Sequence, residues 1–236
     1  MTLMGTLKRY LSAWKRHHRS HGFGIHSPYG FRFVCDVLGE RLPYYSYRGI
    51  EEMHRLVSRQ GTGRVISLKD AKMLFRVTNH FNPACILQVG LSTGVDSASM
   101  LAVSSTSRLT AYHPSALQPV AVTVLKALEP RVELHDDLSA ALERYAAALP
   151  AGAVPYILIN NVETQRELDL LRDFLAGPLA STATVLMRGI DRNPLVAQLW
   201  TACRETMPKG QTYTNDKKAI LIATPRLQRE DFTLWM

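Results

Sequence analysis

Residues 84–94 read Ala-Cys-Ile-Leu-Gln-Val-Gly-Leu-Ser-Thr-Gly. The run at 84–89 is short and mostly apolar, which predicts a buried strand. Gly90 and Gly94 predict a tight turn after it, because glycine lets the backbone bend sharply and approach a ligand closely. The stretch therefore has the form of a strand, a turn and the start of a helix, the unit from which α/β sheets are built.

The same alternation continues along the chain. Short apolar runs that predict strands lie at 84–89, 108–112, 131–134, 154–159 and 183–187. Helices are expected between and after them, because apolar residues in 137–149 and 194–207 recur every three or four positions. Such a succession predicts a parallel, doubly wound sheet. The chain then shows a hairpin pattern, with strands at 211–214 and 218–223 around a turn at Asn215-Asp216-Lys217.

Positive charge is concentrated near the N-terminus. The net charge is +8, and residues 1–80 hold 14 of the 28 Lys and Arg but only 5 of the 20 Asp and Glu. Apolar residues of this part trace one helical stripe, at Leu3, Leu7, Tyr10, Leu11 and Trp14. We therefore divide the chain into a basic helical N-terminal segment, 1–66, and an α/β domain, 67–236. The segment either binds an anionic partner, such as a membrane surface or nucleic acid, or packs on the protein's own body.

Two further helices are expected before the first strand. Ser27 and Pro28 supply an N-cap and a proline at the first helical position, and this helix is expected to run to about Leu38. The sequence from Ser67 to Asp70 resembles a capping box and predicts a helix to about residue 80. Residues 50–66 show no clear pattern.

The composition excludes several classes of protein. Its apolar runs are far shorter than the roughly 20 residues that span a bilayer. Charged residues follow the first methionine too closely for a secretory signal peptide. The three cysteines, Cys35, Cys85 and Cys203, are scattered and odd in number, which excludes a disulfide framework and a zinc site built from paired cysteines. We expect a cytoplasmic protein.

A resemblance to a known family begins at residue 21, with His-Gly-Phe-Gly-Ile-His-Ser-Pro-Tyr-Gly-Phe-Arg-Phe-Val. This segment is similar to the leader of a group of bacterial class I S-adenosylmethionine-dependent methyltransferase-like proteins. Residues 74–77 and 86–94 resemble the group's cofactor loop and the helix before it, and the likeness continues to the C-terminus. The resemblance implies an α/β fold: a Rossmann-like, doubly wound sheet of about seven strands with a C-terminal antiparallel hairpin, preceded by a helical segment. It also implies S-adenosylmethionine as cofactor and a small-molecule methyl acceptor.

The chain departs from this family at the strand ends. Where the family carries acids after its first, second, fourth and fifth strands, this chain has Gln88, His113, Asn160 and Arg188. The cofactor has a sulfonium, an ammonium and a ribose diol, which all favour carboxylate partners. Losing charged hydrogen bonds at two or three sites costs about 2–5 kcal/mol. Such a loss weakens micromolar binding to roughly 0.1–10 mM, so we predict a degenerate cofactor pocket.

The cofactor-binding residues expected from position are Gln88, Gly90, Ser92, Gly94, His113 and Asn160. The acids near strand ends that could replace the lost charge are Asp136, Asp137, Glu163 and Asp191. No divalent metal is expected, because amides at Asn160 and Asn161 and the fixed cation of Arg188 replace the carboxylates of a Mg²⁺ site. His113 and His135 are candidates for a general base, and no catalytic residue is assigned.

Three functions remain open at this point. The first is a methyltransferase, of the O-methyltransferase type, with the altered pocket. The second is a catalytically inactive pseudo-methyltransferase that serves as a binding or scaffold module, which the missing acids favour. The third is a nucleic-acid methyltransferase that uses the basic segment for phosphate contacts. The third is the least favoured, because the fourth strand end lacks the Asn/Asp-Pro-Pro-Tyr type of sequence used on flipped bases.

Overall fold

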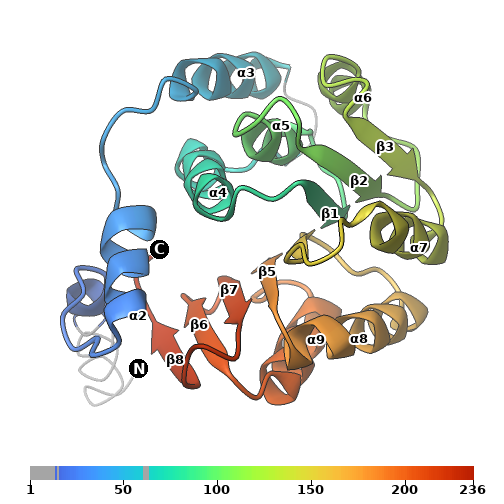
Figure 1. The fold of residues 1–236 in the computed structure, drawn as a ribbon. Coiled ribbons are helices and arrows are strands. Elements are labelled where there is room, and N and C mark those ends of the chain that lie inside the picture. Colours follow the sequence, from blue (N-terminus) through green and yellow to red (C-terminus); the bar gives the residue numbers. More distant parts are fainter. Residues whose placement is uncertain (1–13, 15, 61–63) are drawn as a thin grey trace, which may run out of the picture.

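The computed structural model describes residues 14, 16–60 and 64–236. One eight-stranded sheet runs through the molecule, in the order β3-β2-β1-β4-β5-β7-β6-β8 (Figure 1). Its strands are β1 (Cys85–Val89), β2 (Arg108–Tyr112), β3 (Val132–His135), β4 (Tyr156–Ile159), β5 (Ala183–Arg188), β6 (Gly210–Thr214), β7 (Lys218–Ala223) and β8 (Glu230–Thr233). The helices are α2 (Pro28–Arg32), η1 (Phe33–Leu38), α3 (Tyr47–Arg59), α4 (Leu68–Phe81), α5 (Val95–Leu101), α6 (Pro119–Lys126), α7 (Leu138–Ala148), α8 (Gln165–Ala180) and α9 (Pro194–Thr206).

The sheet confirms the predicted fold class. Strands β3, β2, β1, β4 and β5 are parallel, and β7 then pairs antiparallel with both β5 and β6. The chain order reverses between β1 and β4, because β1 leads to β2 and β3 on one side while β4 and β5 lie on the other. In such sheets the crevice for ligands lies beyond the carboxyl ends of the strands at this point.

Helices cover both faces of the sheet, and side chains of β1 and β4 alternate between two cores. Ile86 and Leu158 belong to the core under α3, α4, α5 and α6. Leu87 and Ile157 belong to the core under α7, α8 and α9. Figure 1 shows these two helical layers on opposite sides of the sheet. Strands buried on both faces explain why their sequences are continuous apolar runs.

The structure differs from the sequence-based expectations at three elements. Residues 50–66 showed no pattern, yet α3 occupies Tyr47–Arg59 and packs Ile50 and Val57 into the core. The helix expected after Ser27 is present, but its second half, η1, is a π-helix. The eighth strand, β8, was not expected, because its four residues, Glu-Asp-Phe-Thr, are mostly polar and it is held by parallel pairing with β6.

The described part of the N-terminal segment packs on the sheet. Phe33 is buried, and its ring lies 4.7 Å from that of Tyr213 on β6, centroid to centroid. The backbone N–H of Trp235 donates to Ser20 Oγ at 2.7 Å, and Arg16 forms an ion pair with Asp216 in the β6–β7 turn. The apolar stripe expected at residues 3–14 lies, apart from Trp14, outside the described residues. Among the residues the structure describes, no helix has the length and apolar character needed to cross a bilayer.

Candidate functional site

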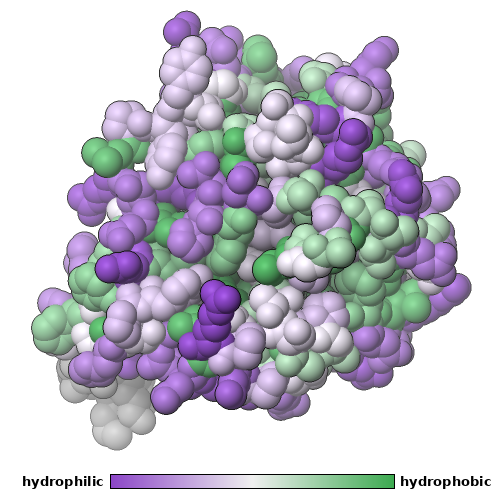
Figure 2. Space-filling view, in the orientation of Figure 1, coloured by the Kyte–Doolittle hydropathy of each residue, from purple (hydrophilic) through white to green (hydrophobic). Residues whose placement is uncertain are grey.

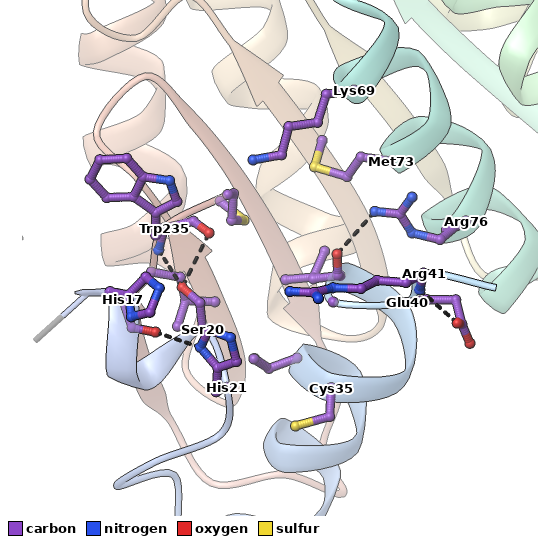
Figure 3. Close-up of a pocket in the computed structure, with 15 residues that line it drawn as sticks. His17, Ser20, His21, Cys35, Glu40, Arg41, Lys69, Met73, Arg76 and Trp235 are labelled. Atoms are coloured by element: carbon purple, nitrogen blue, oxygen red, sulfur yellow. Dashed lines mark hydrogen bonds between the residues drawn. The ribbon is translucent and has the colours of Figure 1, made fainter. Parts of the chain in front are cut away.

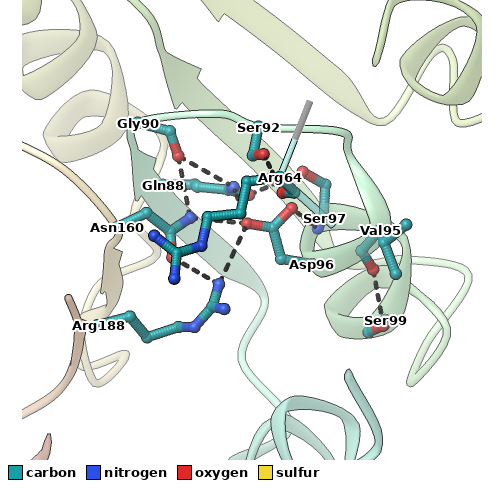
Figure 4. A network of polar contacts seen from close by, with 10 residues as sticks. All are labelled: Arg64, Gln88, Gly90, Ser92, Val95, Asp96, Ser97, Ser99, Asn160 and Arg188. Atoms are coloured by element: carbon teal, nitrogen blue, oxygen red, sulfur yellow. Dashed lines mark hydrogen bonds and ion pairs between the residues drawn. The ribbon is translucent and has the colours of Figure 1, made fainter. Parts of the chain in front are cut away.

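Three polar side chains converge on the carboxylate of Asp96 at the carboxyl edge of the sheet (Figure 4). Gln88 of β1 donates from Nε2 to Asp96 Oδ2 at 2.9 Å, and Asn160, directly after β4, donates from Nδ2 to the same oxygen at 2.7 Å. Arg188 Nη1, at the end of β5, lies 3.9 Å from that oxygen. Asp96 is 1% exposed, so the carboxylate is a buried charge held by neighbouring strands.

The glycine turn places Asp96 in this position. Gly90 and Gly94 have φ values of +82° and +79°, which residues with a Cβ rarely adopt. A Cβ on Gly90 would also lie 3.0 Å from the backbone N of Asn161, and one on Gly94 would lie 2.9 Å from Val124 Cγ1. Glycine is therefore required twice, and helix α5 can begin directly beneath the ends of β1 and β4.

The protein surrounds the buried carboxylate with a connected set of hydrogen bonds. Asp96 Oδ1 accepts from the backbone N of Ser97 at 3.1 Å, and Ser97 Oγ donates to Gln88 Oε1 at 2.8 Å. Arg188 Nη1 donates to Asn160 Oδ1 at 3.1 Å. Each amide thus uses its oxygen for one neighbour and its nitrogen for the carboxylate, which fixes its orientation.

Asp96 is the site residue that the sequence analysis missed. Gln88 occupies the place where the resembled family has the acid of its first strand, so the sequence predicts no carboxylate there. In the structure, Asp96 in the first turn of α5 places a carboxylate at the same edge of the sheet. The signal in the sequence was an acid two residues after Gly94, at the start of the helix that follows the glycine turn.

Each of the four acids considered as replacements either contacts residues outside the Asp96 cluster or is exposed. Asp137 caps α7 by accepting from the backbone N of Ala140 at 2.8 Å. Glu163 accepts from Asn161 Nδ2 at 3.1 Å, and Asp191 lies 3.5 Å from Arg192 Nε. Asp136 is exposed. None of these contacts joins the Asp96 cluster.

The expected cofactor-binding residues other than Gly94, which lies in the glycine turn, divide into three groups. Gln88, Gly90 and Asn160 lie together, because both amide nitrogens also donate to the Gly90 carbonyl, at 3.3 and 3.0 Å. Ser92 instead donates from Oγ to the backbone oxygen of Arg64 at 2.5 Å, on the segment before α4. His113 lies at the end of the adjacent strand β2, where Tyr112 O accepts from Gly90 N at 2.9 Å.

His113 carries an unsatisfied polar atom. Its Nδ1 is buried and has no hydrogen-bond partner among the described residues, while Nε2 lies 3.3 Å from Ser115 Oγ. A buried polar atom without a partner costs free energy, and it calls for a ligand or water to satisfy it. His135, the other histidine considered, likewise has a buried ring nitrogen without a hydrogen-bond partner among the described residues, Nε2, which lies 3.3 Å from Glu133 Oε1. The described residues contain no group of three His, Cys, Asp or Glu side chains that could hold a metal ion. The absence of a metal from the function stays a prediction.

The comparisons with known proteins identify the fold. No family model matches the sequence, and no curated protein is significantly similar to it. The O-methyltransferase from Bacillus cereus, solved in complex with SAH, is 14% identical with a TM-score of 0.54, covering 82% of this chain and 96% of that one.

Two further solved structures are similar. The O-methyltransferase TomG from Streptomyces achromogenes, involved in tomaymycin synthesis and solved in complex with SAM, is 11% identical with a TM-score of 0.51, covering 90% of this chain and 98% of its own. A methyltransferase from Geobacter sulfurreducens is 16% identical with a TM-score of 0.50, covering 82% and 97% of the two chains. At these identities the likeness shows the fold alone: the chain has a Rossmann-like α/β sheet that ends in antiparallel strands, as these three solved structures do.

Proposed function

We propose that the protein binds S-adenosylmethionine at the carboxyl ends of β1, β2 and β4 and acts as a methyltransferase of the O-methyltransferase type, on a small-molecule acceptor. The observation that carries this proposal is the buried carboxylate of Asp96, held at the topological switch point by Gln88 and Asn160. A carboxylate there gives the positively charged donor the partner that the strand ends lack. Structural neighbours solved with SAM or SAH share the fold and support the assignment.

The residues at this edge fit the cofactor. The two glycines allow the backbone to approach a ligand closely, as the donor-binding turn of such a fold requires. The unsatisfied Nδ1 of His113 offers a hydrogen-bonding partner for a ribose hydroxyl at the end of β2. Gln88 and Asn160 hold the Asp96 carboxylate in one orientation, so that little rearrangement is needed when a cation approaches.

Each group has a defined task in this proposal. Bound S-adenosylmethionine would supply a methyl group activated by a positively charged sulfur. Asp96 provides the negative potential at the donor site, and Arg188 moderates it from 3.9 Å. His113 orients the donor, and Gly90, Ser92 and Gly94 shape the turn around it. No side chain is assigned as general base.

The pocket remains altered in this proposal, but less severely than the strand ends alone suggest. One charged hydrogen bond contributes about 1–1.5 kcal/mol more than a neutral one. Asp96 is 1% exposed and supplies negative potential rather than a direct hydrogen bond, and an attraction of this size moves the expected dissociation constant about tenfold, to roughly 10 µM–1 mM.

Titration calorimetry with S-adenosylmethionine and with its demethylated product tests the proposal. Asp96→Asn removes the charge and keeps the size of the side chain, and it should weaken binding at least about tenfold. Asp136→Asn is the matched control, because Asp136 is exposed at the far edge strand, and it should bind as the wild type does. Absence of binding to both ligands at millimolar concentration would contradict the proposal.

One observation favours a second function, the inactive binding or scaffold module. Both oxygens of Asp96 already accept hydrogen bonds from the protein, so the carboxylate is satisfied without a ligand. A module of this kind would keep the cluster for stability alone. In that case neither cofactor form would bind, and Asp96→Asn would change the melting temperature without changing any ligand response.

A further inference from the structure

A cavity of about 610 Å³ lies beside the Asp96 cluster, beyond the end of β5. Its walls come from the end of β5, the β6–β7 turn, the start of α4 and residues 234–236. Arg188 joins the two places, because it lines the cavity and also contacts Asn160 of the cluster. Figure 4 shows the side chains of Arg64 and Arg188 reaching the same side of the cluster, and both line this cavity.

The lining of the cavity has a large excess of positive charge. Seven Lys and Arg residues line it, against two acids, Asp70 and Asp191. Among the lining side chains, cations therefore outnumber anions by five. Like charges gathered in one concave site repel one another, and an anionic ligand relieves this repulsion.

Some of these cations are already paired and others are not. Arg16 pairs with Asp216, Lys218 with Asp70 and Arg192 with Asp191. Among the described residues, Arg64, Lys69 and Lys217 form no ion pair. Lys69 also faces the neighbouring cavity of about 670 Å³ between α4 and the N-terminal segment, where it extends toward Trp235 (Figure 3). Three cationic side chains are therefore available to a ligand.

Burial and the neighbouring charges shift the pKa values of the partly buried pair Lys218–Asp70. Burial lowers the pKa of Lys218, and the charges of Lys69 and Arg188 lower it further, against the opposing effect of Asp70. Burial alone would raise the pKa of Asp70, but Lys218 and Arg188 hold it below its ordinary value. The charges of Lys69 and Arg188 thus add a positive contribution at this pair, beside the larger effects of burial and of the contact between Lys218 and Asp70.

The size and composition of the cavity define the class of ligand. A volume of about 610 Å³ is in the range of sites for small molecules. Arginine guanidinium groups match phosphate oxygens in a forked geometry, and lysines add point charges. Leu234, Trp235 and Met236 supply the apolar part of the lining.

We propose that this cavity binds a small molecule that carries a phosphate group attached to an apolar part. The cavity adjoins the donor site through Arg188, and on the proposed function, on which this last step rests, the bound molecule is the methyl acceptor.

Calorimetry with phenyl phosphate, a small aromatic phosphate ester, tests the binding site without any cofactor. Phenyl phosphate should bind more tightly than inorganic phosphate, and benzyl alcohol, which lacks the charge, should not bind measurably. The double variant Lys69→Ala/Lys217→Ala should lose about tenfold or more in affinity for phenyl phosphate. The matched control, Lys126→Ala/Lys209→Ala, removes two exposed lysines outside the cavity and should leave the affinity unchanged.

Three results would overturn the proposal. Equal binding of phenyl phosphate by both double variants would show that the cavity is not the site. If inorganic phosphate binds as tightly as the ester, the apolar part of the ligand contributes nothing to affinity, which contradicts the proposed class of ligand. If a single strand of ten nucleotides binds and phenyl phosphate does not, the ligand is a nucleic acid and not a small molecule.

The same proteins separate this proposal from the proposed function. Lys69→Ala/Lys217→Ala should keep the wild-type affinity for S-adenosylmethionine, because neither lysine contacts the Asp96 cluster. Binding of phenyl phosphate without any binding of the cofactor would uphold the phosphate site and refute its role as an acceptor site. Binding of the cofactor without phenyl phosphate would refute the phosphate site alone.

Discussion

Asp96 Oδ2 lies 2.7 Å from Asn160 Nδ2, so a carboxylate on helix α5 is bonded to the amide that follows β4, across the point where the strand order reverses. Gln88 donates to the same oxygen from β1. The sequence predicts no acid at the end of the first strand, yet a negative charge is present at this edge: it comes from the helix, while the strand contributes an amide that holds it.

Restoring the acid in the first strand should harm the protein. Gln88→Glu would place a second carboxylate where the amide nitrogen now lies 2.9 Å from Asp96 Oδ2. Two carboxylates this close share a proton, which raises the pKa of the pair. Because the folded state then holds a proton that the unfolded state releases, the loss should be about 1–3 kcal/mol at pH 7 and shrink as the pH falls toward 5.

Urea unfolding of Gln88→Glu at several pH values measures this effect. Gln228→Glu is the control, since Gln228 is exposed and should show little loss at either pH. A Gln88→Glu protein that is as stable as the wild type at pH 7 would mean that the two carboxylates lie apart.

Removing the carboxylate should separate its structural from its binding role. Asp96→Ala leaves one N–H of each amide, on Gln88 and on Asn160, without its acceptor, while the Gly90 carbonyl still accepts from both nitrogens, and we expect a loss of about 2–4 kcal/mol in the free energy of unfolding. Asp96→Asn keeps one acceptor oxygen and should lose less stability than alanine does. Chemical denaturation measures both variants. An alanine variant no less stable than the asparagine variant would contradict the bonding described here.

The fold was predictable because its signals are local. Buried strands such as β1 and β4 are continuous apolar runs, and the turn after β1 needs glycine at Gly90 and Gly94 for steric reasons. Helix α3 was not predicted because only Ile50 and Val57 are buried along its length. Two buried residues in thirteen do not form an apolar stripe that indicates a helix. Strand β8 was missed because its sequence is mostly polar, and pairing with β6 rather than composition makes it a strand.

The site was only partly predictable because charge was judged position by position. Gln88, Gly90 and Asn160 were located from their places at strand ends, and they do lie together. The role of Asp96 depends on which side chains face each other across β1, α5 and β4, which no spacing in the sequence reveals. The basic cavity escaped notice for the same reason, since its cations come from segments as distant as Arg16 and Lys217.

The ion pair of Asp70 with Lys218 should make stability depend on pH in acid. Lys218 holds the pKa of Asp70 below its ordinary value in spite of burial. A lowered folded-state pKa gives stability that is full above the unfolded value of about 3.9 and is lost as the pH falls through the folded value. Asp70→Asn should therefore cost about 1–3 kcal/mol from pH 5 to 7, and the difference from wild type should close below about pH 4.

Thermal or urea unfolding across this pH range checks the expectation. Asp173→Asn is the control, because the Asp173 side chain is 80% exposed and should contribute little at any pH. A difference between Asp70→Asn and wild type that stays constant down to pH 3 would show that the charge of Asp70 is not involved.

The unsatisfied Nδ1 of His113 should make this histidine costly for folding and useful for binding. His113→Phe removes a buried polar atom that has no partner among the described residues, so the ligand-free protein should be as stable as the wild type or more stable. On the proposed function the same change should weaken binding of S-adenosylmethionine about 3- to 10-fold, the value of one neutral hydrogen bond.

His113→Asn, which keeps a polar atom close to the position of Nδ1, should recover part of the affinity, and His26→Phe, at an exposed histidine, should change neither quantity. Melting temperatures with and without the cofactor measure both effects, and a His113→Phe protein that loses stability while keeping its affinity would mean that the ring serves packing alone.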